Sequence, residues 1–441
     1  MESARDRIAG ALARLGLDRP EARAWALYDW ANSAFMTTVV AGVFPIYFAK
    51  VAAAGLPPEV AQGRFAAGTA IALLCVALLA PPLGALADAR AWRKPLLFAF
   101  ALLGVLGTAG LVVVGQGDWL PALLFFGIGN LGAGASVVFY DSLLPHVASP
   151  GQVDRTSTSG FALGYLGGGI LLALNLAWIL RPDLFGMADA EETLPTRLAF
   201  ASVAVWWLVF TLPLMKRVPE PPALRRPPGE RRSALHGLAA TLREIRSFPN
   251  AFLMLLAFLI YNDGILTIIR MATIYGTGIG LETKHMVTAL LIVQFIGIPC
   301  SIAFGSLAGR LGTKRSILLA LGVYGVVTVL GFYMDSAADF YLLAGLVGLV
   351  QGGAQALSRS LFSSLIPRQK SAEFFGFFAI GEKFAGVLGP TLFAMVLATS
   401  DSSRTAMAWV LVFFVVGGLI LTRVDVDEGR AEARAAEAEL G

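Results

Sequence analysis

The chain has 441 residues, of which 56% are hydrophobic and only 15% are charged, and its mean hydropathy is +0.71. Soluble globular domains carry about 25% charged residues, so the composition excludes an ordinary soluble enzyme, a disordered chain and a disulfide-stapled secreted domain. It indicates a membrane protein with many spans. The two cysteines and three histidines show no metal-ligand spacing, and we expect no metal and no cofactor.

The chain begins with 24 polar, Arg-rich residues that lack the apolar core of a signal peptide. Apolar runs follow, and a bilayer core of about 30 Å needs roughly 20 such residues per helix. Segments of about ten alternating residues, typical of a membrane β-barrel, are not found in the sequence. The sequence predicts an all-α polytopic membrane protein with twelve transmembrane helices, at residues 27–49, 66–87, 95–115, 119–142, 159–180, 197–215, 250–275, 286–308, 316–334, 339–362, 374–398 and 405–422.

The orientation of these helices follows from the basic residues in the connections, because cytoplasmic loops carry an excess of Lys and Arg. With the N-terminus inside, most of the 34 Lys and Arg residues fall in the segments that face the cytoplasm. We therefore expect a multi-pass protein of the cell inner membrane with both termini cytoplasmic. Membrane lipid surrounds such a chain, and we expect it to be a monomer that binds no nucleic acid.

A basic, Pro-rich segment, 216–249, divides the twelve predicted helices into two groups of six. Its composition and its place between the two groups predict a cytoplasmic linker. We expect a cytoplasmic N-terminal segment at 1–24, six-helix bundles at 25–215 and 250–422, and a cytoplasmic tail at 423–441.

The two halves carry similar strings at matching places. Gly84-Ala-Leu-Ala-Asp88 follows the second span, and Gly305-Ser-Leu-Ala-Gly309 follows the eighth. Ser142-Leu-Leu-Pro145 and Ser364-Leu-Ile-Pro367 close the fourth and tenth spans. Because each half has six spans, the repeats run parallel, related by a pseudo-twofold axis along the membrane normal, as in transporters that bind solute at the midplane.

This pattern resembles the major facilitator superfamily. Within it, four strings resemble one family, the fungal autophagy-related vacuolar amino-acid effluxers and their bacterial relatives: Tyr28-Asp-Trp-Ala-Asn-Ser-Ala-Phe35, Tyr261-Asn-Asp-Gly264, Gly352-Gly-Ala-Gln-Ala-Leu-Ser-Arg-Ser360 and Ala372-Glu-Phe-Phe-Gly-Phe377. The resemblance covers residues 25–422. It implies the major facilitator fold, secondary transport, and amino-acid export as the family's best-known activity.

The loop after the second span departs from the superfamily pattern at Ala89 and Ala91, and the second copy has Gly309 in place of Asp88. Only the first copy can therefore use an acidic group of its own to latch the bundles. We expect Asp88 to pair with Arg90, with Arg93 or with a helix N-terminus across the bundle interface. The predicted gating residues are Gly84, Asp88, Arg90, Arg93 and Asp141.

Charged residues inside the predicted spans need an explanation, because a charge at the bilayer centre is costly. Asp29, Asp141, Asp263, Arg270 and Arg359 lie on the first, fourth, seventh and tenth spans. One polar helix in every three is the spacing that a central cavity would produce. The other reading is structural: these groups neutralise one another and hold helices together.

Polar side chains form a stripe on the seventh and on the tenth span, with Asp263 roughly 20 Å from the cytoplasmic end at 1.5 Å per residue. Both charge signs are present, which suits a zwitterion better than a simple cation. The predicted substrate-binding residues are Asn32, Asn262, Asp263, Arg270, Gln351, Gln355, Ser358 and Arg359. An amino acid would place its carboxylate toward an Arg and its ammonium toward an Asp.

A carboxylate balanced between burial and a nearby cation can exchange a proton as the cavity opens and closes. The residues expected to couple a proton to transport are Asp29, Asp263, Glu382 and Lys383. Glu382 and Lys383 are neighbours about 100° apart around a helix, so we expect them to pair poorly with each other and one of them to reach another helix.

We therefore expect a secondary active transporter for a small polar or zwitterionic solute, coupled to protons. The alternatives are a non-transporting membrane sensor that uses the same cavity, and a transporter of a sugar or a peptide fragment. A sensor would need a folded output domain, and an intramembrane enzyme would need a nucleophile–base pair or metal ligands within the spans. The sequence shows neither, and the direction of transport cannot be read from it.

Overall fold

The computed structural model describes residues 4–187, 191–224, 243–278, 280–384, 395–396 and 408–440, and within these ranges it contains helices and turns but no strand. Ten of the described helical segments are long and apolar enough to cross a membrane, and Leu411–Thr422 is a shorter apolar helix. The expected eleventh and twelfth spans, 374–398 and 405–422, lie partly outside the described residues. The all-helical membrane fold is confirmed.

Helices before the linker form the first half of the molecule. Their bounds are α1 (Ala4–Arg14), α2 (Pro20–Ala34), the π-helix η1 (Phe35–Val43), α3 (Phe44–Tyr47), the π-helix η2 (Phe48–Ala52), α4 (Pro58–Arg90), α5 (Arg93–Gly110), η3 (Leu111–Val113), α6 (Trp119–Ser142), α7 (Leu144–Val147), α8 (Val153–Leu180), η4 (Pro182–Phe185) and α9 (Leu194–Arg217).

Helices after the linker form the second half. Their bounds are α11 (Pro249–Gly278), α12 (Thr283–Leu311), α13 (Thr313–Phe332), α14 (Ala337–Ser364), η5 (Arg368–Lys370), α15 (Ser371–Phe384), α18 (Leu411–Thr422) and α19 (Val426–Leu440). Most of the linker, residues 225–242, lies outside the described residues.

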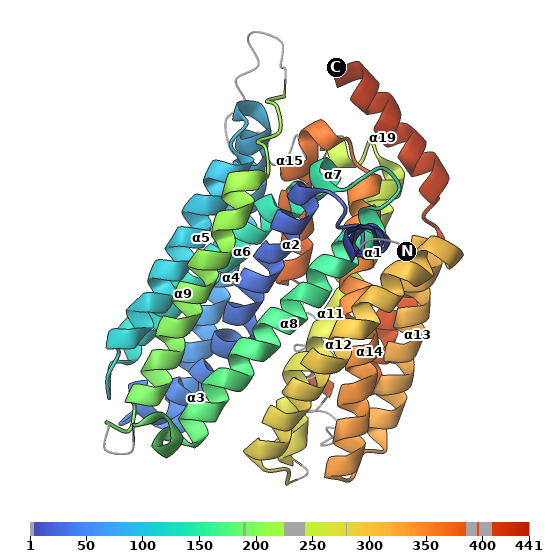
Figure 1. Ribbon diagram of the computed structural model, residues 1–441. Helices are drawn as coiled ribbons and strands as arrows, with labels where there is room; N and C mark the ends of the chain where they lie inside the picture. Colours follow the sequence, from blue (N-terminus) through green and yellow to red (C-terminus); the bar gives the residue numbers. More distant parts are fainter. Residues whose placement is uncertain are drawn as a thin grey trace.

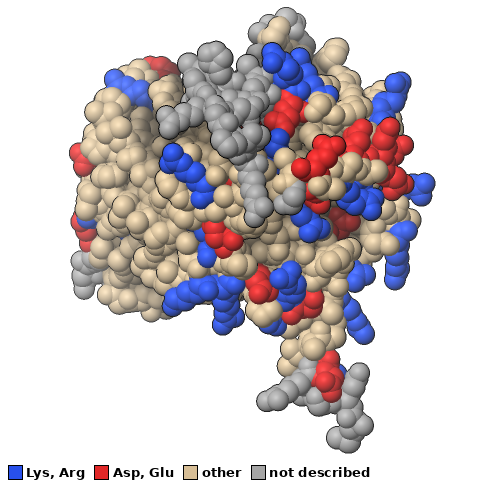
Figure 2. Space-filling model, turned by 90° about the horizontal axis from the view of Figure 1, so that it is seen from above, with Lys and Arg blue, Asp and Glu red and all other residues tan. Residues whose placement is uncertain are grey.

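The long helices run side by side, and the two halves meet along α4 with α15 and along α8 with α12 and α14 (Figure 1). The helices α1, α7 and α19 and the start of α15 lie at the same end of the molecule (Figure 1). We call this end the terminal face. Figure 2 looks onto it and shows Lys, Arg, Asp and Glu side chains gathered there.

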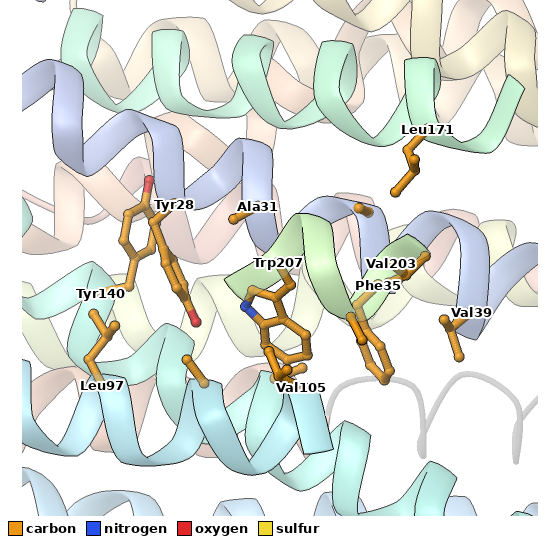
Figure 3. Close-up of a cluster of buried hydrophobic side chains, with 14 of the residues drawn as sticks. Tyr28, Ala31, Phe35, Val39, Leu97, Val105, Tyr140, Leu171, Val203 and Trp207 are labelled. Carbon is orange, nitrogen blue, oxygen red and sulfur yellow. The ribbon is translucent and has the colours of Figure 1, made fainter. Parts of the chain in front are cut away.

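Each half has its own apolar core. Buried side chains of residues 17–218 form one cluster, to which the second half adds Ala372. A second cluster is built from residues 245–424 together with Ala80 and Val138 of the first half. In the first core, Phe35 packs against the fully buried Trp207 with ring centres 5.3 Å apart (Figure 3).

The first span contains two π-helical segments, η1 and η2, that the apolar pattern did not predict. A π-helix shifts the face that following residues present, and such segments are frequent at functional sites. The span therefore runs over Pro20–Ala52, longer than the expected 27–49. Asp29 and Asn32 lie on α2 before this change of winding.

Candidate functional site

Arg359, five residues from the end of α14, reaches across from the second half into the first. Its Nη1 donates to Asp141 Oδ1 at 2.9 Å, and its Nη2 lies 3.4 Å from Asp29 Oδ2. Its Nε donates to Ser157 Oγ at 2.9 Å and its Nη2 to the Ser157 carbonyl at 3.0 Å. Three charged residues predicted for different roles, Asp29, Asp141 and Arg359, are thus parts of one cluster.

Aromatic rings enclose this cluster. The Arg359 guanidinium lies 4.9 Å from the ring centre of Trp25, 5.3 Å from Tyr140 and 4.7 Å from Phe161. Tyr140 Oη donates to Asp29 Oδ2 at 2.7 Å, and the Trp25 and Tyr140 rings stack with centres 4.4 Å apart. The rings exclude water and therefore strengthen the ion pairs.

The charges in this cluster do not balance. Two carboxylates, Asp29 and Asp141, share one guanidinium, so the group carries one net negative charge when both acids are ionised. The side chains of Asp141 and Arg359 are only 10% and 5% exposed. A buried net charge is unfavourable.

Asp88, near the end of α4, forms a second connection between the halves. Its carboxylate lies 2.6 Å from Arg93 Nη2 and accepts the backbone N–H groups of Ala372 at 3.2 Å and Glu373 at 2.9 Å. These N–H groups belong to the first turn of α15, where the helix dipole favours a negative charge. A Cβ at Gly84 would collide with the Ala372 carbonyl, so the two helices need glycine there to approach this closely.

Arg93 extends the Asp88 connection to the short helix η5. Its Nη2 donates to the Gln369 carbonyl at 3.0 Å, and the side chain is fully buried. Glu220 fixes the start of α5 because its two carboxylate oxygens accept the N–H groups of Arg93 and Lys94, both at 2.8 Å. Burial raises the pKa of Glu220 above its ordinary value of 4.5.

The symmetry-related place in the second half uses a different acid. Asp154, in the first turn of α8, accepts hydrogen bonds from Thr313 Oγ1 at 2.7 Å and Ser360 Oγ at 2.5 Å. Thr313 begins α13 as Arg93 begins α5. The second loop copy, which has Gly309 in place of an acid, is thus held by a carboxylate from the opposite half.

Two further hydrogen bonds join the halves near the terminal face. Ser157 Oγ donates to the Ala356 carbonyl at 2.7 Å, and Ser371 Oγ donates to the Ser142 carbonyl at 2.9 Å. All four residues are buried. The described polar contacts between the halves therefore close this end of the molecule. One further hydrogen bond between the halves, from Gln294 Nε2 to Thr37 Oγ1 at 2.9 Å, lies deeper.

Several predicted substrate-binding residues have polar atoms without partners. Asn32 Nδ2 and both polar atoms of Asn262 are buried and form no hydrogen bond to any described residue. Gln351 and Gln355 are partly exposed on a helix whose residues between and after them are mostly buried. Unpaired buried amides are rare in folded proteins.

The structure does not bring every predicted residue together. Asp263 is fully buried on α11, where its carbonyl accepts Thr267 Oγ1. Ser358 instead bonds to Tyr261 Oη at 2.5 Å. Arg90 lies over the ring of Trp92, with no ion pair among the described contacts. The side chain of Arg270 lies outside the described residues.

Glu382 and Lys383 correct one expectation. Although they are neighbours on α15, Lys383 Nζ lies 3.2 Å from Glu382 Oε2. The two side chains leave the helix about 100° apart, but the long, flexible lysine stem bends back far enough to reach the carboxylate. Lys383 also lies close to Gly134 of α6, in the other half.

Sequence reasoning missed Trp25, Tyr140, Asp154 and Ser157. Tyr140 directly precedes Asp141, and Asp154 is an acidic residue in the first turn of α8, as Glu373 is in the first turn of α15. Trp25 and Ser157 carry no such signal. In the part of the chain that the structure describes, no group of three or more His, Cys, Asp and Glu is placed to hold a metal ion.

Comparison with known proteins agrees with this architecture. The chain is 36% identical to YxiO, an MFS-type transporter of Bacillus subtilis (strain 168), over 91% of this chain and 94% of that protein. It is 25% identical to autophagy-related protein 22-1 of Penicillium rubens, over 90% of this chain and 82% of that one.

Solved major facilitator structures share the fold. The proton:xylose symporter XylE superposes with a TM-score of 0.68 at 14% identity, over 92% of this chain and 95% of XylE. The E. coli fucose:proton symporter FucP superposes with a TM-score of 0.69 at 12% identity, over 92% of this chain and 98% of FucP. The family described as "Vacuole effluxer Atg22 like" matches residues 59–155 and 148–434. The chain therefore belongs to the Atg22-like effluxer family, within the major facilitator superfamily of membrane transporters.

Proposed function

We propose that this transporter carries a small polar or zwitterionic solute, an amino acid or a related metabolite, by proton-coupled alternating access. The observation that carries the proposal is the Arg359 cluster, in which one half of the molecule inserts a cation between two carboxylates of the other. Such a contact is strong when the halves meet and is lost when they part. It gives the molecule two distinct states.

The bundles 25–215 and 250–422 are the units that we propose to rock against each other. The excess of basic residues in the connections at the terminal face supports its placement in the cytoplasm. On this assignment the structure is closed toward the cytoplasm. The Asp88 connection and the Asp154 connection stabilise that closed state, and both break when the cytoplasmic side opens.

We place the solute beside the unpaired amides of Asn32 and Asn262, where Gln351 and Gln355 offer further donors and acceptors. Asp263 and Arg270 on α11 supply the two charges that a zwitterion needs. Ser358 and Arg359 close the site on the terminal side. Because Arg359 is held by Asp29 and Asp141 in this state, it becomes free for a carboxylate only when the terminal face opens.

The coupling proton has a site in the same cluster. Asp29 and Asp141 together exceed the charge of Arg359 by one, so release of Arg359 would leave two buried carboxylates facing each other. Uptake of a proton makes that release less costly. Asp263 and the Glu382–Lys383 pair complete the set of proposed coupling groups.

Reconstituted vesicles test the proposal. Counterflow against a panel of amino acids and metabolites identifies the solute, and accumulation driven by a pH gradient shows the coupling. In the Asp263→Asn variant we expect solute exchange to continue while pH-driven accumulation is lost. If this variant accumulates solute normally, Asp263 is not a coupling residue; if Asp263→Asn with Arg270→Gln restores full transport, the pair is only structural.

A further inference from the structure

A large cavity lies on the terminal face beneath the C-terminal helix α19, and Asp154, Thr313 and Ser360 of the connection described above form part of its wall. Its volume is about 1010 Å³. The ends of α12 and α14, the start of α13 and the inner side of α19 line it, and the first half contributes Asp154 and its neighbours. Cavities that bind small molecules have volumes of about 300–1,000 Å³, so this one is large enough for an organic ligand.

Basic side chains predominate in the cavity wall. Six of its lining residues are basic, against the four acids Asp154, Asp425, Asp427 and Glu437; the basic residues are Lys314, Arg315, Arg368, Arg423, Arg430 and Arg434. The excess of positive charge makes the cavity attractive to anions.

Most of the acids in the wall are already engaged. Asp154 accepts hydrogen bonds from Thr313 and Ser360. Asp425 Oδ1 accepts the N–H groups of Asp427 and Glu428 at the start of α19, and Glu437 accepts the N–H of Arg368 at 3.0 Å. These hydrogen bonds hold the carboxylates in place, and Glu437 Oε1 also pairs with Arg368 Nε at 3.7 Å. The lining still carries two more basic residues than acids.

Three of the basic groups have partners: Arg368 pairs with Glu437, Lys314 Nζ donates to the Val424 carbonyl at 2.8 Å, and Arg430 Nε donates to Ser364 Oγ at 3.3 Å. The other three have no acidic partner among the described contacts. The side chains of Arg315 and Arg423 form no hydrogen bond or ion pair with any residue that the structure describes, and the Arg434 guanidinium contacts only the Arg430 carbonyl. Ser363 is 4% exposed, lines the cavity, and its hydroxyl has no partner within the described ranges. A buried hydroxyl without a partner needs an explanation, and a bound acceptor supplies one.

We propose that this cavity binds an anion of the phosphate class, either the head group of an anionic lipid or a free phosphate ester. Arginine side chains present paired donors that match phosphate oxygens, and the Ser363 hydroxyl adds a neutral donor. Both halves of the molecule contribute to the wall. The anion therefore binds best when the terminal face is closed, and it favours that state.

Binding can be measured on the purified full-length protein by thermal unfolding, with two probes that separate the sources. Pyrophosphate added in detergent represents the free ester, and nanodiscs containing phosphatidylglycerol, compared with phosphatidylcholine alone, represent the lipid. We expect at least one probe to raise the unfolding temperature. Sodium chloride at matched ionic strength must not reproduce the rise, because general screening would then explain it.

The variant Arg423→Gln/Arg434→Gln removes two lining charges, and we expect it to weaken the effective probe by about tenfold or more. The matched control is Arg7→Gln/Arg14→Gln, which removes two exposed charges from α1 at the same face, outside the cavity. The single variant Arg315→Gln serves if the double variant unfolds without any probe. The proposal is overturned if neither probe stabilises the protein, or if the control loses as much affinity as the cavity variant. Because this readout is binding, its failure would leave the proposed transport cycle untouched.

Discussion

Arg359 joins the two halves of the molecule through a single side chain. Its guanidinium is 5% exposed and contacts two carboxylates and one serine of the other half. Removing one partner of a buried ion pair costs about 3–5 kcal/mol, because an uncompensated charge stays behind. Arg359 is therefore the residue whose loss should affect the closed state most.

We expect Arg359→Gln to lower the stability of the purified protein by about 3–5 kcal/mol, since it leaves Asp29 and Asp141 facing each other without a cation. Asp141→Asn should cost much less, because Asp29 and Arg359 then balance. Thermal unfolding of both variants in the same detergent compares them. Equal losses would show that charge balance does not control this cluster.

The substitution Asp88→Asn tests the connection that Asp88 forms with Arg93 and with the start of α15. The variant keeps an oxygen for the N–H of Ala372 but leaves the buried Arg93 without its anion. We expect slower transport with solute binding retained, because the closed terminal face becomes harder to form. Turnover and equilibrium binding are measured on the same preparation, and a loss of binding at unchanged turnover of bound solute would refute the role.

At the scale of elements, the contact of α4 with α15 depends on two glycines, Gly84 of α4 and Gly376 of α15, whose added Cβ would meet the backbone of Ala80 and Pro81. A Cβ at Gly84 would meet the Ala372 backbone, whereas one at Gly63 of the same helix would meet nothing within 4 Å. We expect Gly84→Ala to destabilise the closed state by about 1–3 kcal/mol, as overpacking does, and Gly63→Ala to be neutral or stabilising. The unfolding temperature and the transport rate are measured for both variants. Equal effects of the two substitutions would mean that the close approach of α4 and α15 is unimportant.

The start of α5 gives a pH-dependent prediction. Because burial raises the pKa of Glu220, the folded protein keeps this proton to a higher pH than the unfolded chain does. The contribution of Glu220 to stability therefore falls as the pH rises from its ordinary pKa of 4.5 through the raised value. Glu220→Gln should remove that slope. Unfolding curves recorded across this range test it, and an unchanged slope would contradict it.

Much of the element arrangement could be predicted from the sequence. Apolar runs long enough to span a bilayer locate the helices, and the repeated strings relate the halves, because both signals are local. The role of Asp88 could be anticipated since it lies in a repeated loop. The π-helical winding of η1 was not predictable, because no Pro or Gly signal marks where it begins at Phe35.

The site was harder to predict than the fold. Asp29, Asp141 and Arg359 were found as charges within spans, but their meeting in one cluster depends on how α2, α6 and α14 pack. Trp25 and Ser157 belong to residue types that are common in ordinary helix packing. Contacts between residues far apart in the sequence decide such a cluster, and one sequence carries no record of them.

At the scale of the whole molecule, the account rests on two states of the terminal face. The structure closes this face through Arg359, Asp88 and Asp154, each of which bridges the halves. In the proposed cycle, solute passes this side only when these contacts break together. A covalent bond across the closed face should therefore stop transport and leave the fold intact.

The most direct measurement is transport by a reversibly cross-linked protein. Ser142 ends α6 and Ser371 begins α15, and the Ser371 hydroxyl donates to the Ser142 carbonyl at 2.9 Å. Ser142 and Ser371 are replaced by cysteine in a protein whose native Cys75 and Cys300 are replaced by serine. The control carries Ser142→Cys alone in the same background. The account predicts that oxidation abolishes transport of the solute identified by counterflow, that reduction restores it, and that the control is unaffected. Undiminished transport by fully cross-linked protein would contradict alternating access through this face.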